Sequence, residues 1–98
     1  MFPVLHGPYG EEGTVLGVFE IAGKPYVGCG VLPSALAMDK DIAKSMFENA
    51  GIPTSRWSVV RGTEFRSDPT GTSASILEDL GSPVFVKPAE LGSSVGIT

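Results

Sequence analysis

The spacing of apolar and polar residues predicts three helices. Residues 14–22 carry apolar side chains at helical spacing, with Thr14 as the expected N-cap and Gly23 just beyond the end. Residues 39–50 give the clearest helix, because an aspartate can cap it and its apolar residues fall on one face. Residues 73–80 predict a third, shorter helix.

Short runs of β-forming residues lie between these helices. The runs over 1–5, 56–61 and 84–86 predict strands, and residues 24–30 predict a short extended segment. Residues 95–98 have the pattern of a hairpin's return arm. The alternation of strand and helix indicates an α/β or α+β fold.

Composition adds detail to this picture. The 13 glycines and 8 prolines are spread along the chain, which favours many short elements joined by tight turns. The Ser/Thr/Gly-rich stretch 66–75 predicts a mobile loop, and Phe47, Trp57 and Phe85 are predicted core residues. Because a hairpin without a partner sheet is not a finished domain, we expect this sequence to be part of a longer protein.

The charge of the chain narrows the function classes. The 98 residues carry a net charge of −4 and no basic cluster, which argues against binding to nucleic acid or to a membrane surface. The single Cys29 cannot complete an internal disulfide or a Cys-based metal site, and it fits a reducing compartment. No apolar run approaches the roughly 20 residues of a membrane helix. We therefore expect a soluble intracellular protein.

Lys87 and the loop after it are the first candidate site. A lysine that ends a predicted strand is usually a surface residue, because lysines are rarely buried. The loop over 92–96, Gly-Ser-Ser-Val-Gly, offers hydroxyls and unhindered backbone N–H groups that could close over phosphate oxygens. An ordinary glycine turn explains the pattern of that loop equally well, so both interpretations stay open.

Two familiar motifs fit this loop poorly. The P-loop pattern places its lysine after the glycines and opens a helix, whereas Lys87 precedes them. The loop matches G-x-S-x-G with Ser94 as the nucleophile of a serine hydrolase. Such a nucleophile sits directly between strand and helix and precedes its histidine, but the one histidine, His6, lies far upstream. A serine hydrolase is therefore disfavoured.

Other polar residues could also take part in a site. Lys40 falls in the first turn of the predicted helix 39–50, where a positive charge opposes the helix dipole, so it is either a surface lysine or a functional one. His6 begins the loop 6–13, where a strand meets a helix and open α/β sheets bind ligands. Glu11 and Glu12 in this loop are more typical of caps and loop contacts than of an acid–base pair.

Four segments that follow one another in the chain carry a family resemblance: FPVLHGPYGEEG, SALAMDKDIAK, AGIPT and PVFVKPAELGSSVGIT. In that order they resemble the D-alanine–D-alanine ligase family of ATP-grasp enzymes. The ordered combination of H-G-x-x-G-E, M-D-K and V-K-P-x-x-x-G-S-S-V-G is specific, and the resemblance covers almost the whole chain. The sequence also resembles the related D-alanine–D-lactate and D-alanine–D-serine ligases.

The resemblance implies a ligation reaction used in peptidoglycan precursor synthesis. ATP phosphorylates the carboxylate of one D-alanine, and the amino group of a second attacks the acyl phosphate to give the dipeptide, ADP and phosphate. The residues that the resemblance places at the ATP phosphates are Lys40, Lys87, Gly92, Ser93 and Ser94. It also places Ser93 at the first D-alanine and His6 beside the substrate. In physical terms these residues position the reactants and neutralise charge.

The resemblance also implies a domain organisation. Residues 1–30 would end a Rossmann-like pre-ATP-grasp domain, and residues 31–98 would form the first, incomplete part of the central ATP-grasp domain. The ligands of the required Mg²⁺, the catalytic arginine and the loop that closes on the substrate would all lie outside this chain. The full-length enzyme would be a cytoplasmic homodimer, and the 98 residues alone would be inactive.

Several alternatives remain open within this resemblance. The family usually carries Glu-Asp where this sequence has Glu11-Glu12, and Gln where it has Leu16. Both changes fall on the substrate side, so D-alanine, D-lactate and D-serine all remain possible acceptors. Another ATP-grasp carboxylate–amine ligase, or a nucleotide-binding fragment without turnover, are further alternatives.

Overall fold

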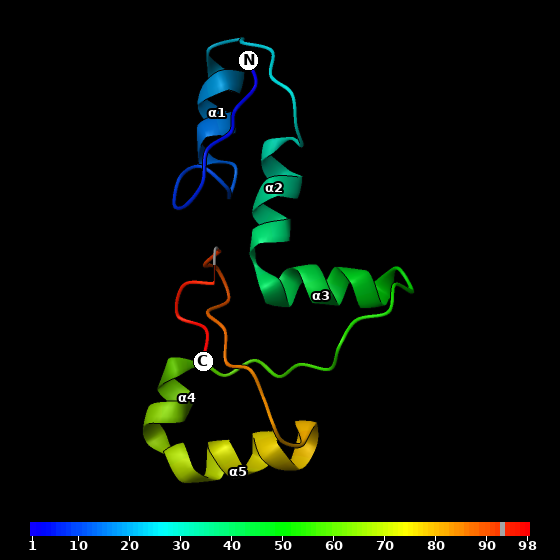
Figure 1. Cartoon of the computed structure of the whole chain (residues 1–98), viewed down its shortest axis with the longest axis vertical. Helices are drawn as coiled ribbons and strands as arrows, with labels where there is room; N and C mark the ends of the chain where they lie inside the picture. The colour runs from blue at the N-terminus through cyan, green and yellow to red at the C-terminus, as the bar shows by residue number, and fades with distance from the viewer. Residues whose placement is uncertain (93) are drawn as a thin grey trace.

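The protein is an elongated arrangement of helices joined by long connecting segments (Figure 1). The structure is a computed structural model that describes residues 1–92 and 94–98. The helices of the described residues are α1 (Thr14–Ile21), α2 (Val31–Met38), α3 (Lys40–Asn49), α4 (Gly62–Ser67) and α5 (Pro69–Leu80). The pair α1 and α2 lies at one end, α3 crosses below α2, and α4 with α5 forms the other end (Figure 1).

Two predicted helices are confirmed, with one correction at a cap. Asp39 caps α3 as predicted, because its Oδ1 accepts hydrogen bonds from the backbone N–H groups of Asp41 (3.0 Å) and Ile42 (3.1 Å). At α1 the N-cap position belongs to Gly13, whose φ of 96° suits glycine, and not to Thr14. Thr14 is instead the first helical residue.

Three features of the helices depart from the prediction. The sequence pattern did not indicate α2 or α4. The third predicted helix begins earlier than Ser73, because the Asp68 side chain accepts a hydrogen bond from the Gly71 N–H (2.9 Å) and Pro69 occupies the first turn of α5. The predicted mobile loop over 66–75 is therefore wrong, since these residues form the end of α4 and most of α5.

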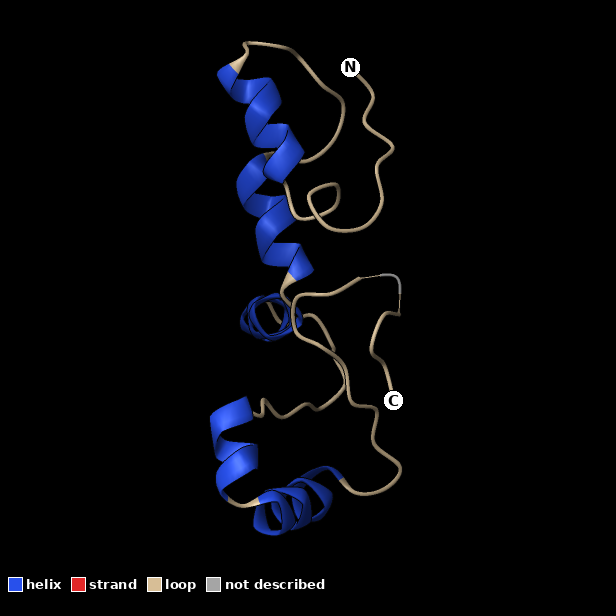
Figure 2. Ribbon diagram, turned by 90° about the vertical axis from the view of Figure 1, so that its left-hand side faces the viewer, coloured by secondary structure: helices blue, strands red, loops and turns tan. Residues whose placement is uncertain are grey.

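The predicted strands are not formed in the described residues (Figure 2). Two isolated pairings mark where strands would begin. Val86 and Thr98 exchange both backbone hydrogen bonds (2.7 and 3.0 Å), the pattern of an antiparallel pair. Met1 donates to the Pro25 carbonyl (2.6 Å) and accepts from the Val27 N–H (2.9 Å), as in a parallel pair. A ladder needs several such pairs between neighbouring strands, so the Rossmann-like character predicted for residues 1–30 is not confirmed.

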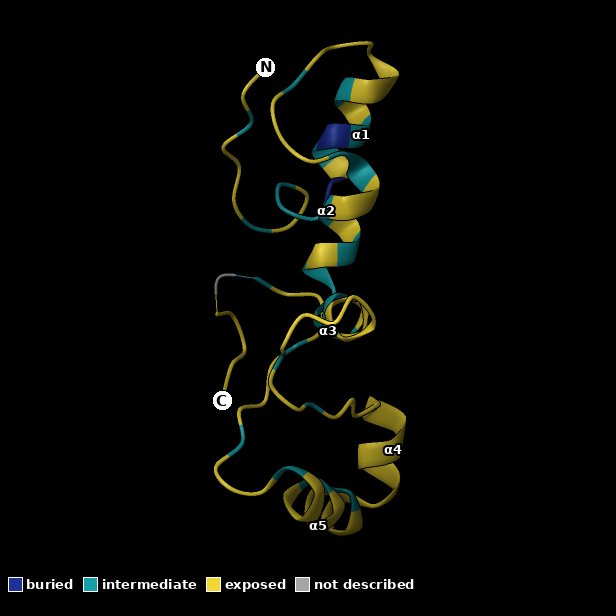
Figure 3. Ribbon diagram, turned by 90° about the vertical axis from the view of Figure 1, so that its right-hand side faces the viewer, coloured by how far each residue is buried: buried dark blue, intermediate teal, exposed yellow. Residues whose placement is uncertain are grey.

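Little of the chain's apolar surface is covered (Figure 3). Leu16 on α1, 7% exposed, is the buried hydrophobic residue of the described chain. Phe85 is 77% exposed and Phe47 45%, so their prediction as core residues is wrong, while Trp57 is half-buried. The radius of gyration is 16.7 Å, against roughly 12.6 Å for a compact domain of this length. These residues alone therefore do not enclose a core of domain size.

The five described helices are all short. The longest, α5, has 12 residues. None of them combines the length and the apolar character that a membrane-crossing helix requires.

Candidate functional site

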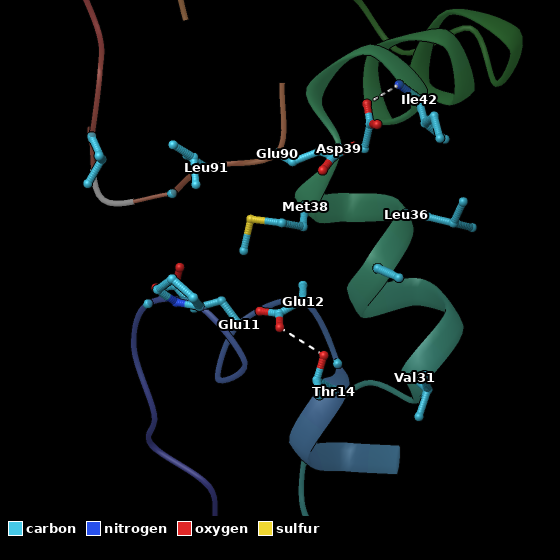
Figure 4. A pocket seen from close by; sticks show the side chains of 16 residues that line it. Glu11, Glu12, Thr14, Val31, Leu36, Met38, Asp39, Ile42, Glu90 and Leu91 are labelled. Atoms are coloured by element: carbon cyan, nitrogen blue, oxygen red, sulfur yellow. Dashed lines mark hydrogen bonds between the residues drawn. The ribbon is translucent and has the colours of Figure 1, made fainter. Parts of the chain in front are cut away.

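A cavity of about 660 Å³ forms where three distant parts of the sequence meet (Figure 4). These parts are the loop after the first extended segment, the junction of α2 and α3, and the segment that leads into the glycine-rich turn. The described lining residues are Gly7, Pro8, Glu11, Glu12, Gly13, Thr14, Val31, Ala35, Leu36, Met38, Asp39, Ile42, Glu90, Leu91, Gly92 and Val95. The motifs H-G-x-x-G-E, M-D-K and G-S-S-V-G thus each contribute residues to one place.

The loop over 6–13 presents two carboxylates to this cavity. The Gly7 carbonyl accepts hydrogen bonds from the N–H groups of Gly10 (3.1 Å) and Glu11 (3.3 Å), which closes the loop. Glu12 Oε1 accepts the Thr14 hydroxyl hydrogen bond at 2.8 Å. Hydrogen bonds from its own backbone N–H and from Thr14 lower the pKa of Glu12 below its ordinary value. Glu12 therefore stabilises the loop through a hydrogen bond within it, as the sequence suggested.

His6 stands at the start of the same loop and faces a different hollow. Its Nδ1 lies 3.7 Å from Glu11 Oε1, and its side chain is exposed. His6 lines a neighbouring cavity of about 360 Å³, together with residues of the loop and α1. Among the described residues no hydrogen bond joins His6 to Ser94, so the geometry offers no support for a Ser–His hydrolase pair.

The Met38-Asp39-Lys40 motif forms the junction between α2 and α3. Met38 points from α2 into the space between Glu11 and Leu91 (Figure 4). Asp39 is the C-cap of α2 and the N-cap of α3, so one residue sets the turn between the two helices. The Lys40 Nζ donates to the backbone carbonyls of Leu91 (2.5 Å) and of Ala89 (3.4 Å).

The glycine-rich segment ends in a tight turn beside this junction. The Gly92 carbonyl accepts from the Val95 N–H at 3.1 Å, and Ser94 adopts a left-handed φ of 59°. A Cβ atom built on Gly92 would lie 2.5 Å from Glu11 Oε2 and 3.8 Å from Met38 Cε. A larger residue there would force the Glu11 carboxylate to move, so glycine permits this close approach. Ser93, a predicted substrate and phosphate residue, lies outside the described residues.

The remaining predicted site residues are placed as follows. Gly92 lines the cavity, and Lys40 is bonded to the segment beside it. Lys87 is exposed and is not among the described residues that line the cavity. The apolar side of the cavity, which α2 supplies through Val31, Leu36 and Met38, was not predicted from the sequence because the helix itself was not predicted. Residues 31–38 are apolar except for Ser34, so they show no amphipathic pattern that would have indicated the helix.

The charge on the cavity wall is acidic. The side chains of Glu11, Glu12, Asp39 and Glu90 all line it. Carboxylates repel phosphate, so a triphosphate would need lysines such as Lys40 and Lys87 at its side. The described residues contain no group of three or more His, Cys, Asp or Glu side chains that could hold a metal ion.

Leu16, one of the departures from the family pattern, is buried on α1. It is not among the described residues that line the cavity. The Leu16 side chain therefore contributes to the packing of α1.

Solved structures share this arrangement. The D-alanine–D-alanine ligase from Coxiella burnetii superposes with a TM-score of 0.84 at 38% identity, over 98% of this chain and 28% of that one. The VanG D-Ala:D-Ser ligase from Enterococcus faecalis gives a TM-score of 0.82 at 45% identity, over 99% of this chain and 27% of that one. The fold is therefore of the ATP-grasp type found in these ligases.

Sequence comparisons identify the family. Family models described as D-ala D-ala ligase N-terminus and D-ala D-ala ligase C-terminus match residues 1–29 and 46–98. The D-alanine–D-alanine ligases of Kocuria rhizophila and Acetivibrio thermocellus are 52% and 53% identical to this chain over all 98 residues. The chain belongs to the D-alanine–D-alanine ligase family. It spans about a quarter of the length of these relatives, 25% and 26%.

Proposed function

We propose that the protein carrying this chain ligates two D-alanines to D-alanyl-D-alanine at the expense of ATP, through an acyl phosphate. The observation that carries this proposal is the family match over the entire chain at about half identity. The cavity supports it, because it gathers the family's three motifs from positions more than 80 residues apart in the sequence.

Individual residues take defined roles in this proposal. The ammonium groups of Lys40 and Lys87 hold the ATP phosphates, and the turn containing Gly92, Ser93 and Ser94 covers them. Ser93 and His6 serve the D-alanine side. The close approach of Gly92 to the Glu11 carboxylate supports this proposal, because it brings the turn that would cover the phosphates next to the loop over 6–13 that would face the substrate.

The rest of the enzyme completes the site in this proposal. The residues that would hold Mg²⁺ lie outside this chain, and the ion would supply charge neutralisation at the ATP phosphates. Residues 1–30 belong to the N-terminal pre-ATP-grasp domain and residues 31–98 to the first part of the ATP-grasp domain. The complete enzyme is a cytoplasmic homodimer that supplies peptidoglycan synthesis and binds neither nucleic acid nor membrane.

The test is D-alanine-dependent ADP formation by the complete protein. We expect ADP release to require D-alanine and to fall strongly in Lys87→Ala at limiting ATP, whereas Lys24→Ala, which changes another exposed lysine, behaves as wild type. ATP binding without any D-alanine-dependent ADP formation would instead indicate a nucleotide-binding protein without turnover.

A D-alanine–D-serine ligase is the second candidate. The 45% identity to the VanG D-Ala:D-Ser ligase supports it, and the 52% and 53% identity to two D-alanine–D-alanine ligases keeps it second. The two candidates predict different acceptor use in the same assay. D-serine stimulation of ADP formation in the presence of limiting D-alanine would favour the second.

A further inference from the structure

The side chain of Lys40 makes an unexpected contact for a lysine that opens a helix. A positive charge at the first turn of α3 faces the positive end of the helix dipole. Lys40 Nζ is directed instead to the carbonyls of Leu91 (2.5 Å) and Ala89 (3.4 Å). Its backbone N–H also donates to the Ala89 carbonyl at 3.0 Å. Partners 49 and 51 residues away in the chain thus compensate for the unfavourable position.

These bonds connect the glycine-rich segment, residues 84–98, to the helices. Among the described residues, every hydrogen bond that joins residues 84–98 to the rest of the chain involves Lys40. The other bonds of this segment are internal: the Val86–Thr98 pair and the turn bonds that follow Gly92. The hydrogen bonds that hold the turn beside α3 are therefore those of Lys40, in addition to the close approach of Gly92 to Glu11 and Met38.

We propose that Lys40 is a positioning residue that tethers the entrance of the glycine-rich turn before any nucleotide binds. An ammonium group has three N–H donors. Two of them are directed to the Leu91 and Ala89 carbonyls, so the third can donate to a phosphate oxygen while the tether stays in place. This last step rests on the proposed function, but the tether itself does not.

The tether can be tested by hydrogen exchange in the complete protein without nucleotide. Lys40→Met keeps the aliphatic stem and the backbone bond to Ala89 but removes the ammonium group. We expect roughly three- to tenfold faster exchange in a peptide covering residues 89–98, the effect of losing a charged hydrogen bond at a partly exposed site. Lys40→Arg keeps a cationic donor and restores part of the protection. Lys24→Met is the matched control and leaves exchange unchanged.

The exchange of α3 in the same samples separates a tether from a general loss of folding. Faster exchange confined to residues 89–98, with α3 unchanged, supports the proposal. Unchanged exchange over 89–98 in Lys40→Met, or an equal increase in α3 and this segment, would overturn it. Absence of ATP binding by the wild-type protein, together with faster exchange over 89–98 in Lys40→Met, would count against the proposed function alone, because the exchange experiment contains no nucleotide.

Discussion

Replacement of Asp39 by alanine should loosen α3 by a predictable amount. Asp39 Oδ1 accepts hydrogen bonds from two backbone N–H groups in the first turn, those of Asp41 and Ile42. Removal of such a cap costs about 1 kcal/mol. The lost negative charge at the helix N-terminus adds about 0.5 kcal/mol. The total is about 1.5 kcal/mol, which corresponds to roughly a tenfold change in an opening equilibrium.

Hydrogen exchange of a peptide covering α3, measured on the complete protein, reads this equilibrium directly. We expect exchange in Asp39→Ala to be roughly tenfold faster than in wild type. Asp39→Asn keeps an acceptor oxygen and loses only the charge, so its exchange should rise roughly twofold. Asp68→Ala removes the equivalent cap of α5 and should leave α3 unchanged. Equal exchange in Asp39→Ala and Asp39→Asn would refute the assignment of the cap.

Three further changes have defined outcomes. Lys87→Ala should weaken ATP binding by about 1.5–3 kcal/mol, the range for a charged hydrogen bond; calorimetry that finds unchanged affinity would count against the phosphate role. The Glu20 carboxylate, which accepts the Tyr26 hydroxyl hydrogen bond at 2.7 Å, raises the pKa of Tyr26. Any stability from this bond is present at neutral pH and lost as pH rises through the raised pKa, and Glu20→Gln should move the tyrosine absorbance titration to lower pH. Trp57→Phe removes the donor of the 3.0 Å bond to Asp41 Oδ1 and should destabilise the protein by about 1 kcal/mol in urea unfolding; no change in midpoint would contradict that value.

The helices that could be predicted were those with clear signals at their ends. The helix α3 has both an amphipathic pattern and an aspartate cap, and the structure uses both. The helix α2 has Gly30 at its N-cap position, lacks a side-chain cap and is apolar except for Ser34. Its sequence therefore shows no alternation of apolar and polar positions that would indicate a helix. The Asp68-Pro69 pair was a usable start signal for α5, but the many small polar residues around it were interpreted as a loop.

The strands could not be predicted in the same way, because a strand depends on its neighbours. Phe85 and Val86 have strong β propensity, yet both are exposed and only Val86 is paired. The candidate site could likewise be predicted only in part. The sequence motifs indicated which segments take part in one site, and residues of these segments line one cavity in the structure. The hydrogen bond from Lys40 to the Leu91 carbonyl could not be predicted, because a backbone carbonyl is present at every residue and the side chain at position 91 does not indicate it.

The central claim is that the complete protein joins two D-alanines. The most direct measurement is mass spectrometry of the products formed from ATP and an equimolar mixture of D-alanine, D-serine and D-lactate. The account predicts D-alanyl-D-alanine as the main product, formed together with ADP. A mixture dominated by D-alanyl-D-serine or D-alanyl-D-lactate, or ATP turnover with no ligated product, would contradict it.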